Sequence, residues 1–221
     1  MQMLRNIMLF LVYIMSLSMC YAQKNRIFQH KDIKKILLKH QTVAILPFRV
    51  SIERGEKRSD DSTEHTLRGE AQRESYNIPL TGTFLWVHYK KENAPALQSW
   101  DKTQDILASI AYKPIESILT DSLRKIAKAL KVDALIFGIV NMYEDKYTTN
   151  FGRTQFASEE IVSIHCSIYD GETGVLIWQN EDSTAYSLRL EERVSLGKNT
   201  EIILARIFER LPYFKGKQKK K

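Results

Sequence analysis

The passage from residue 114 to residue 140 constrains the fold more than any other part of the sequence. Apolar residues recur there on one helix face, at Ile115, Ile118, Leu119, Leu123, Ile126, Ala127 and Leu130. Pro114 suits the first turn of that helix, and Thr120-Asp121 offers a second, later start by capping. The helix runs into Val132–Val140, which is apolar on both faces apart from Asp133 and Gly138. Since a helix before a strand covered on two sides is half of a β–α–β unit, the passage predicts an α/β fold.

Other segments complete the predicted sheet and its cover. Thr42–Phe48 is a short apolar run whose length and branching favour a buried strand. Residues 162–168 alternate apolar and polar side chains, residues 170–174 make a turn, and Val175–Trp178 starts the returning strand. Apolar residues at 203–211 form one face of a last helix. We therefore predict a mixed sheet flanked by helices, with a C-terminal strand hairpin and a closing helix.

Three segments are less regular. Residues 24–40 have the pattern of a weak amphipathic helix. Residues 49–75 are strongly polar and lack periodicity, which predicts a mobile excursion. Residues 76–91 alternate as a strand would, but the order of elements favours a helix there, with aromatic residues such as Phe84 and Trp86 packed in the core.

The first residues have the form of an export signal. Arg5 precedes an uncharged apolar run at residues 7–19, which is shorter than the roughly 20 residues of a membrane span. Residues 1–22 are then a signal peptide cleaved after Ala22. The alternative is a lipobox, in which Cys20 would be the lipid-attachment residue. Met19 is bulkier than a lipobox requires, which favours cleavage after Ala22. The sequence thus predicts export to the periplasm, with attachment at the inner face of the outer membrane as the alternative.

Residues 23–214 have the length of a single domain, and 43% hydrophobic residues give it material for a core. The formal net charge is +7, and much of the excess lies in the tail, residues 215–221. We expect this basic tail to be disordered and solvated. Because an exported protein rarely meets nucleic acid, no nucleic-acid partner is expected.

No motif in the sequence points to a catalytic, cofactor-binding or metal site, and we predict none. The histidines lack zinc-ligand spacing with one another or with a cysteine; they are His30, His40, His65, His88 and His165. Cys166 falls on the apolar face of its strand, which predicts an inert buried thiol. Glu159-Glu160 and Glu191-Glu192 flank the hairpin and fit solvated strand ends. Neither a nucleophile elbow nor a phosphate loop is present.

Three segments in this order carry a family resemblance: Val43–Phe48, Leu123–Gly138 and Tyr169–Trp178. They resemble a group of bacterial envelope proteins that includes CsgG, LpoB and the amino-terminal domain of TolB. The resemblance implies a non-enzymatic binding or assembly role in the cell envelope, and many members are lipid-anchored to the outer membrane. The polar stretch after the first strand does not match the membrane-spanning hairpins of a CsgG-type pore, so pore formation is not implied.

The leading hypothesis is therefore a non-enzymatic exported envelope protein that binds or helps assemble another envelope component. Its partner would be an envelope protein or a second copy, with membrane association if Cys20 is lipidated. One alternative is a secreted hydrolase with a dispersed active site, which a deep pocket gathering His88, His165 or the acidic pairs would favour. The other is a self-assembling secretion-type subunit.

Overall fold

The computed structural model describes residues 27–55, 61–112, 120–150, 154–189 and 196–214. Its strands are β1 (Ile27–Gln29), β2 (Thr42–Ile45), β3 (Arg49–Arg54), β4 (Ala96–Leu97), β5 (Ala134–Asn150), β6 (Thr154–Asp170) and β7 (Leu176–Arg189). Its helices are α2 (Ile33–Leu37), α3 (Asp61–Tyr89), α4 (Trp100–Ser109), α5 (Thr120–Leu130) and α6 (Leu196–Glu209). No helix in these ranges is long and apolar enough to cross a membrane.

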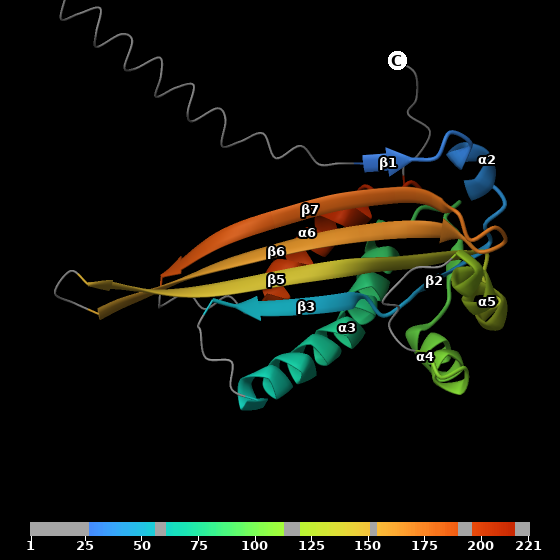
Figure 1. The fold of residues 1–221 in the computed structure, drawn as a ribbon. Helices are drawn as coiled ribbons and strands as arrows, with labels where there is room; N and C mark the ends of the chain where they lie inside the picture. The colour runs from blue at the N-terminus through green and yellow to red at the C-terminus, as the bar shows by residue number, and fades with distance from the viewer. Residues whose placement is uncertain (1–26, 56–60, 113–119, 151–153, 190–195, 215–221) are drawn as a thin grey trace, which may run out of the picture.

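The described strands form one mixed sheet in the order β1-β7-β6-β5-β2-β4, and β3 also pairs with β5. β5, β6 and β7 are consecutive antiparallel strands, whereas β2 and β3 run parallel to β5. In Figure 1, α4 and α5 lie near one end of these three long strands, and the strands continue well beyond the two helices toward the opposite end. The α/β fold class, with its helix-flanked mixed sheet, strand hairpin and closing helix, is confirmed.

β2 and β3 follow the same edge of β5 with one interruption. Between Ile45 and Arg49 the edge strand has one residue more than β5 does, which is a bulge in the pairing. Pro47, which has no N–H to donate, lies in this interruption. The fully buried Phe48 fills the space over Gly138, where a Cβ would lie 2.4 Å from the phenyl ring. Gly138 is thus required by the packing of Phe48 against the sheet.

Two apolar clusters fill the faces of the sheet. The larger joins one face to α2, α3 and α6 and includes Ile33, Trp86 and Ile203. The smaller joins the other face to α4 and α5 through Leu107 and Leu123. Since both faces of the sheet have helices packed on them, the central strand β5 is apolar on both sides, as the sequence of residues 132–140 predicts.

Several boundaries differ from the sequence-based predictions. The stretch at 49–75, predicted as an excursion without regular structure, instead contributes β3 and the first half of α3. Residues 24–40, predicted as one helix, contain β1 and the five-residue α2, because β1 pairs with the edge of β7. The helix favoured for 76–91 is confirmed as the second half of α3. The signal peptide, Cys20 and the tail at 215–221 lie outside the described residues, so they stay predictions.

Candidate functional site

The helix α3 has two apolar faces, and only one of them packs on the sheet. Ile78 and Trp86 point inward and are buried. Between them, a Cβ on Gly82 would lie 2.9 Å from the ring of Phe208 in α6 and 3.0 Å from Ile45 in β2. The absence of a side chain at Gly82 therefore lets α3 lie close to both α6 and the sheet.

The second apolar face of α3 points to solvent. Tyr76, Leu80, Phe84 and Val87 follow one another at about one residue per helical turn. Leu80 is 42% exposed, Phe84 77% and Val87 61%. Single exposed apolar residues are ordinary on protein surfaces, but a continuous stripe of large ones marks a contact surface.

The stripe borders a groove between α3 and α6. The groove encloses about 720 Å³ and is floored in part by the buried Ile78. Leu80 and Phe84 rise on the α3 side, and the exposed Ile202 rises on the α6 side. The contacting helices α3 and α6 thus leave an exposed apolar groove between the described residues on their outer side. We call this surface the α3–α6 groove.

The charges at the α3–α6 groove are negative. Glu74 on α3 and Glu201 on α6 both line it, together with uncharged polar residues such as Asn77 and Thr200. Glu74 also faces Arg73 on the same helix at 3.8 Å, so Glu201 is the acidic residue more open to a partner's cation. No histidine, cysteine or lysine is among the described residues that line the groove. The arrangement fits recognition of an apolar side chain with a cation beside it, and its lining supplies no nucleophile paired with a base.

A buried polar cluster lies at the end of the sheet where β6 finishes. His40 Nδ1 lies 2.8 Å from the Tyr213 hydroxyl, and His40 Nε2 lies 3.0 Å from Asp170 Oδ1. The Thr173 amide donates to the other oxygen of Asp170 at 2.8 Å. Burial alone would raise the pKa of Asp170, but the hydrogen bonds from Thr173 and His40 outweigh it and hold that pKa below its ordinary value.

Burial raises the pKa of Tyr213, and the negative charges of Asp170 and Asp133 add to this effect. Tyr213 therefore keeps its proton near neutral pH and is a poor base. The cluster ties the segment after α6 to the turn between β6 and β7. In the sequence His40 belongs to the predicted helix at 24–40 and has no zinc-ligand spacing to another histidine or cysteine. No pattern there indicates its contacts with residues that lie far away in the chain.

The remaining sequence candidates are scattered over the structure. Cys166 is fully buried in the sheet, so the prediction of a buried thiol is confirmed, and burial raises its pKa to about 12. His165 faces Glu181 at 3.6 Å on the sheet, whereas His88 stacks edge-on against Tyr89 on α3. Neither histidine lines the α3–α6 groove. Within the described ranges no three His, Cys, Asp or Glu side chains gather as a metal site would require.

The acidic pairs give no catalytic arrangement either. Glu159 and Glu160 lie on β6, opposite Asp145 and Glu144 of β5 in the strand register. The pair at 191–192 lies outside the described residues. A hydrolase would be favoured by a pocket that gathers His88 or His165 with these carboxylates. None of the hollows identified between the described residues is such a pocket.

The fold and the groove define a helix-flanked mixed α/β protein with an apolar furrow on its helical face. No family model matches the sequence, and no curated protein matches it. The chain is similar to the PelC dodecamer from Paraburkholderia phytofirmans at 11% identity, with 84% of this chain and 94% of that chain covered and a TM-score of 0.43.

Two further solved structures are similar at the same low level. Lipoprotein GNA1162 from Neisseria meningitidis shares 12% identity over 75% of this chain and 94% of that chain, with a TM-score of 0.40. The LpoB C-terminal domain from Salmonella enterica shares 11% identity over 69% of this chain and 91% of that chain, with a TM-score of 0.32. Scores this low identify no family, so the functional proposal stands on the sequence and on the surface of the protein.

Proposed function

We propose that this protein is a non-enzymatic, exported component of the cell envelope that binds or helps assemble another envelope protein. The observation that carries the proposal is the α3–α6 groove with its exposed stripe, Leu80, Phe84 and Val87. The leader at residues 1–22 supports the compartment, because its short basic start and apolar run have the form of an export signal.

The groove fits a protein partner better than it fits a small substrate. Its walls are large apolar side chains that already lie in solvent, and covering them would remove apolar surface from water. Its acidic residues, Glu74 and Glu201, lie beside this apolar surface, as in contacts that have an apolar centre and a polar rim. The expected partner presents an apolar anchor flanked by lysine or arginine.

Co-purification from envelope extracts under mild crosslinking tests the proposal. The matched variants are Phe84→Ser with Leu80→Ser on the groove, and Ile110→Ser at an exposed apolar position after α4. The wild type and Ile110→Ser should retain the same envelope protein, identified by mass spectrometry, and the groove variant should lose it. Recovery of only free monomer from the wild type would contradict the proposal.

The mass of the mature amino terminus tests the compartment separately. A chain that begins at Gln23 places the protein in the periplasm, and an acylated Cys20 places it at the inner face of the outer membrane. An uncleaved Met1 in a soluble fraction would remove export from the proposal.

Self-association is a second candidate function, and the outer edge of β7 favours it. β1 covers this edge only opposite Trp178–Asn180, while β7 continues to Arg189. Within the described residues no strand pairs with the edge beyond Asn180, and such an edge offers free backbone groups to another strand. Light scattering after gel filtration distinguishes a closed oligomer from a monomer that needs a different partner.

A further inference from the structure

One end of the molecule gathers lysines that form no salt bridge with another described residue. The segment around α2 carries Lys31, Lys34, Lys35 and Lys39, all exposed. In the described part of the chain none of these ammonium groups lies in a salt bridge. Asp32 is the one acidic residue between positions 31 and 39.

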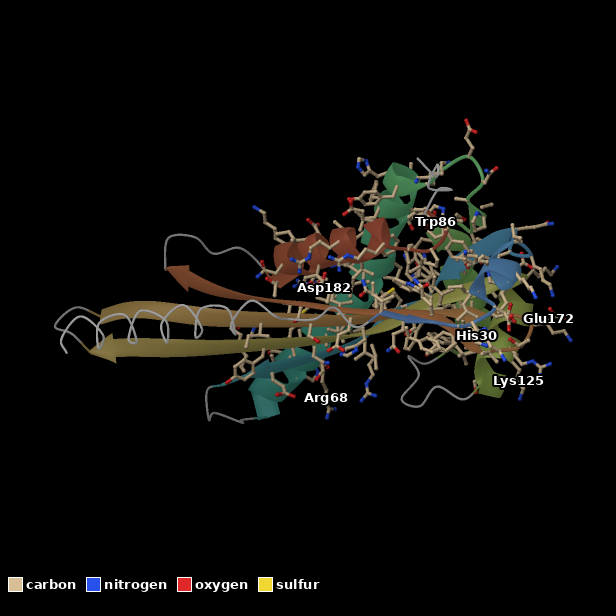
Figure 2. All side chains as sticks on the ribbon, turned by 90° about the horizontal axis from the view of Figure 1, so that it is seen from above. His30, Arg68, Trp86, Lys125, Glu172 and Asp182 are labelled. Carbon is tan, nitrogen blue, oxygen red and sulfur yellow. The ribbon has the colours of Figure 1, made fainter. Side chains whose placement is uncertain are left out.

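The end of α5 adds a second set of cations at the same end. Lys125, Lys128 and Lys131 are exposed and also lie in no salt bridge between described residues. In Figure 1, α2 and α5 both lie at the end where β6 turns into β7, and Figure 2 labels Lys125 and Glu172 at that end. We call this surface the basic end.

A hollow joins the two sets of lysines. It encloses about 400 Å³, and its lining includes Lys39 from the α2 segment together with Lys128 and Lys131 from α5 and beyond. The carboxylates of Asp133, Asp170 and Glu172 also line it. The first two are already engaged within the protein, whereas Glu172 is exposed and lies in no salt bridge between described residues.

Hydrogen bonds within the protein hold two of these carboxylates, so Glu172 is the exposed acid of this lining. One oxygen of Asp133 accepts hydrogen bonds from the Gln41 and Thr42 amides at 2.8 and 2.9 Å. Asp170 accepts from His40 and Thr173, as described above. The lysines of the basic end outnumber its acidic residues Asp32 and Glu172, so a net repulsion among them remains, and a surface of negative charge would relieve it.

The basic end also exposes apolar side chains. Leu38 lies between Lys35 and Lys39 in sequence and is 87% exposed, the highest value among the exposed large apolar residues. Val175 is exposed on the turn between β6 and β7. Lysines around a projecting leucine suit the interface of a membrane, where the leucine enters the acyl boundary and the ammonium groups meet headgroup phosphates.

We propose that the basic end binds the surface of an anionic phospholipid membrane, with Leu38 inserted between the headgroups. The proposal is independent of the α3–α6 groove, which lies on α3 and α6 rather than on α2 and α5. An exported protein could then hold a membrane surface with one region and a protein partner with the other.

Vesicle flotation with the purified protein tests this proposal. The probes are vesicles of phosphatidylethanolamine with phosphatidylglycerol, and neutral vesicles of phosphatidylcholine. We expect binding to the anionic vesicles at about 0.1 M salt, weakening as salt screens the charges, and no binding to the neutral ones. Replacing Lys34, Lys35 and Lys39 by Gln should weaken binding about 100-fold, at roughly fivefold for each lysine. Leu38→Ser should weaken it about tenfold.

Two matched variants remove the same charge elsewhere. One replaces Lys90, Lys91 and Lys198 by Gln, and the other replaces Lys219, Lys220 and Lys221 of the tail by Gln. Both should keep vesicle binding within about threefold of the wild type, since neither replaces a lysine of the basic end. Phe84→Ser, a groove variant, should bind vesicles as the wild type does. Thermal unfolding checks that each variant is folded.

Three results would overturn the membrane proposal. The first is no binding to anionic vesicles by the wild type. The second is an equal loss in all three triple-lysine variants, or a loss in the tail variant alone, which would mean that net charge or the tail is responsible. The third is displacement of the protein from vesicles by inorganic phosphate or duplex DNA at equal charge concentration, which would identify a phosphate or nucleic-acid site instead.

Discussion

Replacing Gly138 by Ala should destabilise the protein through a contact that the strand register imposes. An alanine Cβ at this position would lie 2.4 Å from the backbone oxygen of His165 and 2.4 Å from a ring carbon of Phe48. The His165 oxygen belongs to β6, which is paired with β5 at this point, so it cannot withdraw without loss of the ladder. Phe48 is fully buried and has no free space to enter.

The magnitude follows from overpacking, which costs about 1–3 kcal/mol when a well-packed core must accept an extra methyl group. Here two neighbours must move, one of them backbone, so we expect the upper part of that range, about 2–3 kcal/mol. A Tm change of ~2–4 °C per kcal/mol for a domain of this size then predicts a decrease of about 5–10 °C.

Gly69→Ala is the matched control, because nothing lies within 4 Å of a Cβ at that position on α3. Replacing a helical glycine by alanine there should stabilise the protein by about 0.5–1 kcal/mol. Urea unfolding monitored by tryptophan fluorescence measures both variants. A Gly138→Ala protein as stable as the wild type would refute the close packing of Phe48 on β5 and the register of β5 with β6.

Asp170→Asn should reduce the loss of stability that the protein shows between about pH 5 and about pH 3. A carboxylate whose pKa is lowered by folding stabilises the protein above its ordinary pKa of 3.8 and loses that contribution as the pH falls. Urea unfolding across this range measures the effect, and an unchanged pH dependence would contradict it. Asp182→Ala should cost about 1.5–3 kcal/mol. Asp182 on β7 is buried and accepts hydrogen bonds from Arg206 on α6 at 3.1 Å and from Arg210, just after α6, at 3.2 Å. The matched control is Glu181→Ala, at a neighbouring side chain that is 41% exposed, and it should cost less than about 1 kcal/mol by the same measurement. Equal losses of stability in the two variants would show that Asp182 does not hold α6. Cys166 should resist iodoacetamide in the native protein near neutral pH, because its thiol is buried with a pKa of about 12, and it should react in urea. Mass spectrometry measures the labelling. Rapid labelling of the native protein would place the thiol at the surface.

The central strand and the C-terminal hairpin could be predicted because their apolar patterns are strong and local. Residues 132–140 are apolar on both faces, and 162–168 alternate, so these patterns locate β5 and β6, although both strands extend further than those ranges. β3 was missed although Val50 and Ile52 alternate with polar residues, because the surrounding charges suggested a solvated loop. Its partner β5 lies some ninety positions away in the chain, and pairing at that separation leaves no local signal.

The α3–α6 groove could not be predicted for a similar reason. The aromatic residues at 76–91 were expected in the core, which is correct for Trp86 and wrong for Phe84. A signal is present, since Tyr76, Leu80 and Phe84 form one apolar row and Ile78 and Trp86 form another. One helix cannot turn both rows to the same sheet, but which row is left outside depends on where α6 packs. That placement is a property of the tertiary structure.

Site-specific photo-crosslinking in living cells tests the proposed protein-binding role most directly. A photoreactive phenylalanine analogue replaces Phe84 on the α3–α6 groove in one strain and the exposed Ile110 in another. The groove position should give one discrete adduct with an envelope protein, and Ile110 should give none. The adduct should disappear when Ile202 on the opposite wall of the groove is replaced by Glu. Equal, diffuse crosslinking from both positions, or an adduct that survives the Ile202→Glu change, would contradict a binding role for this groove.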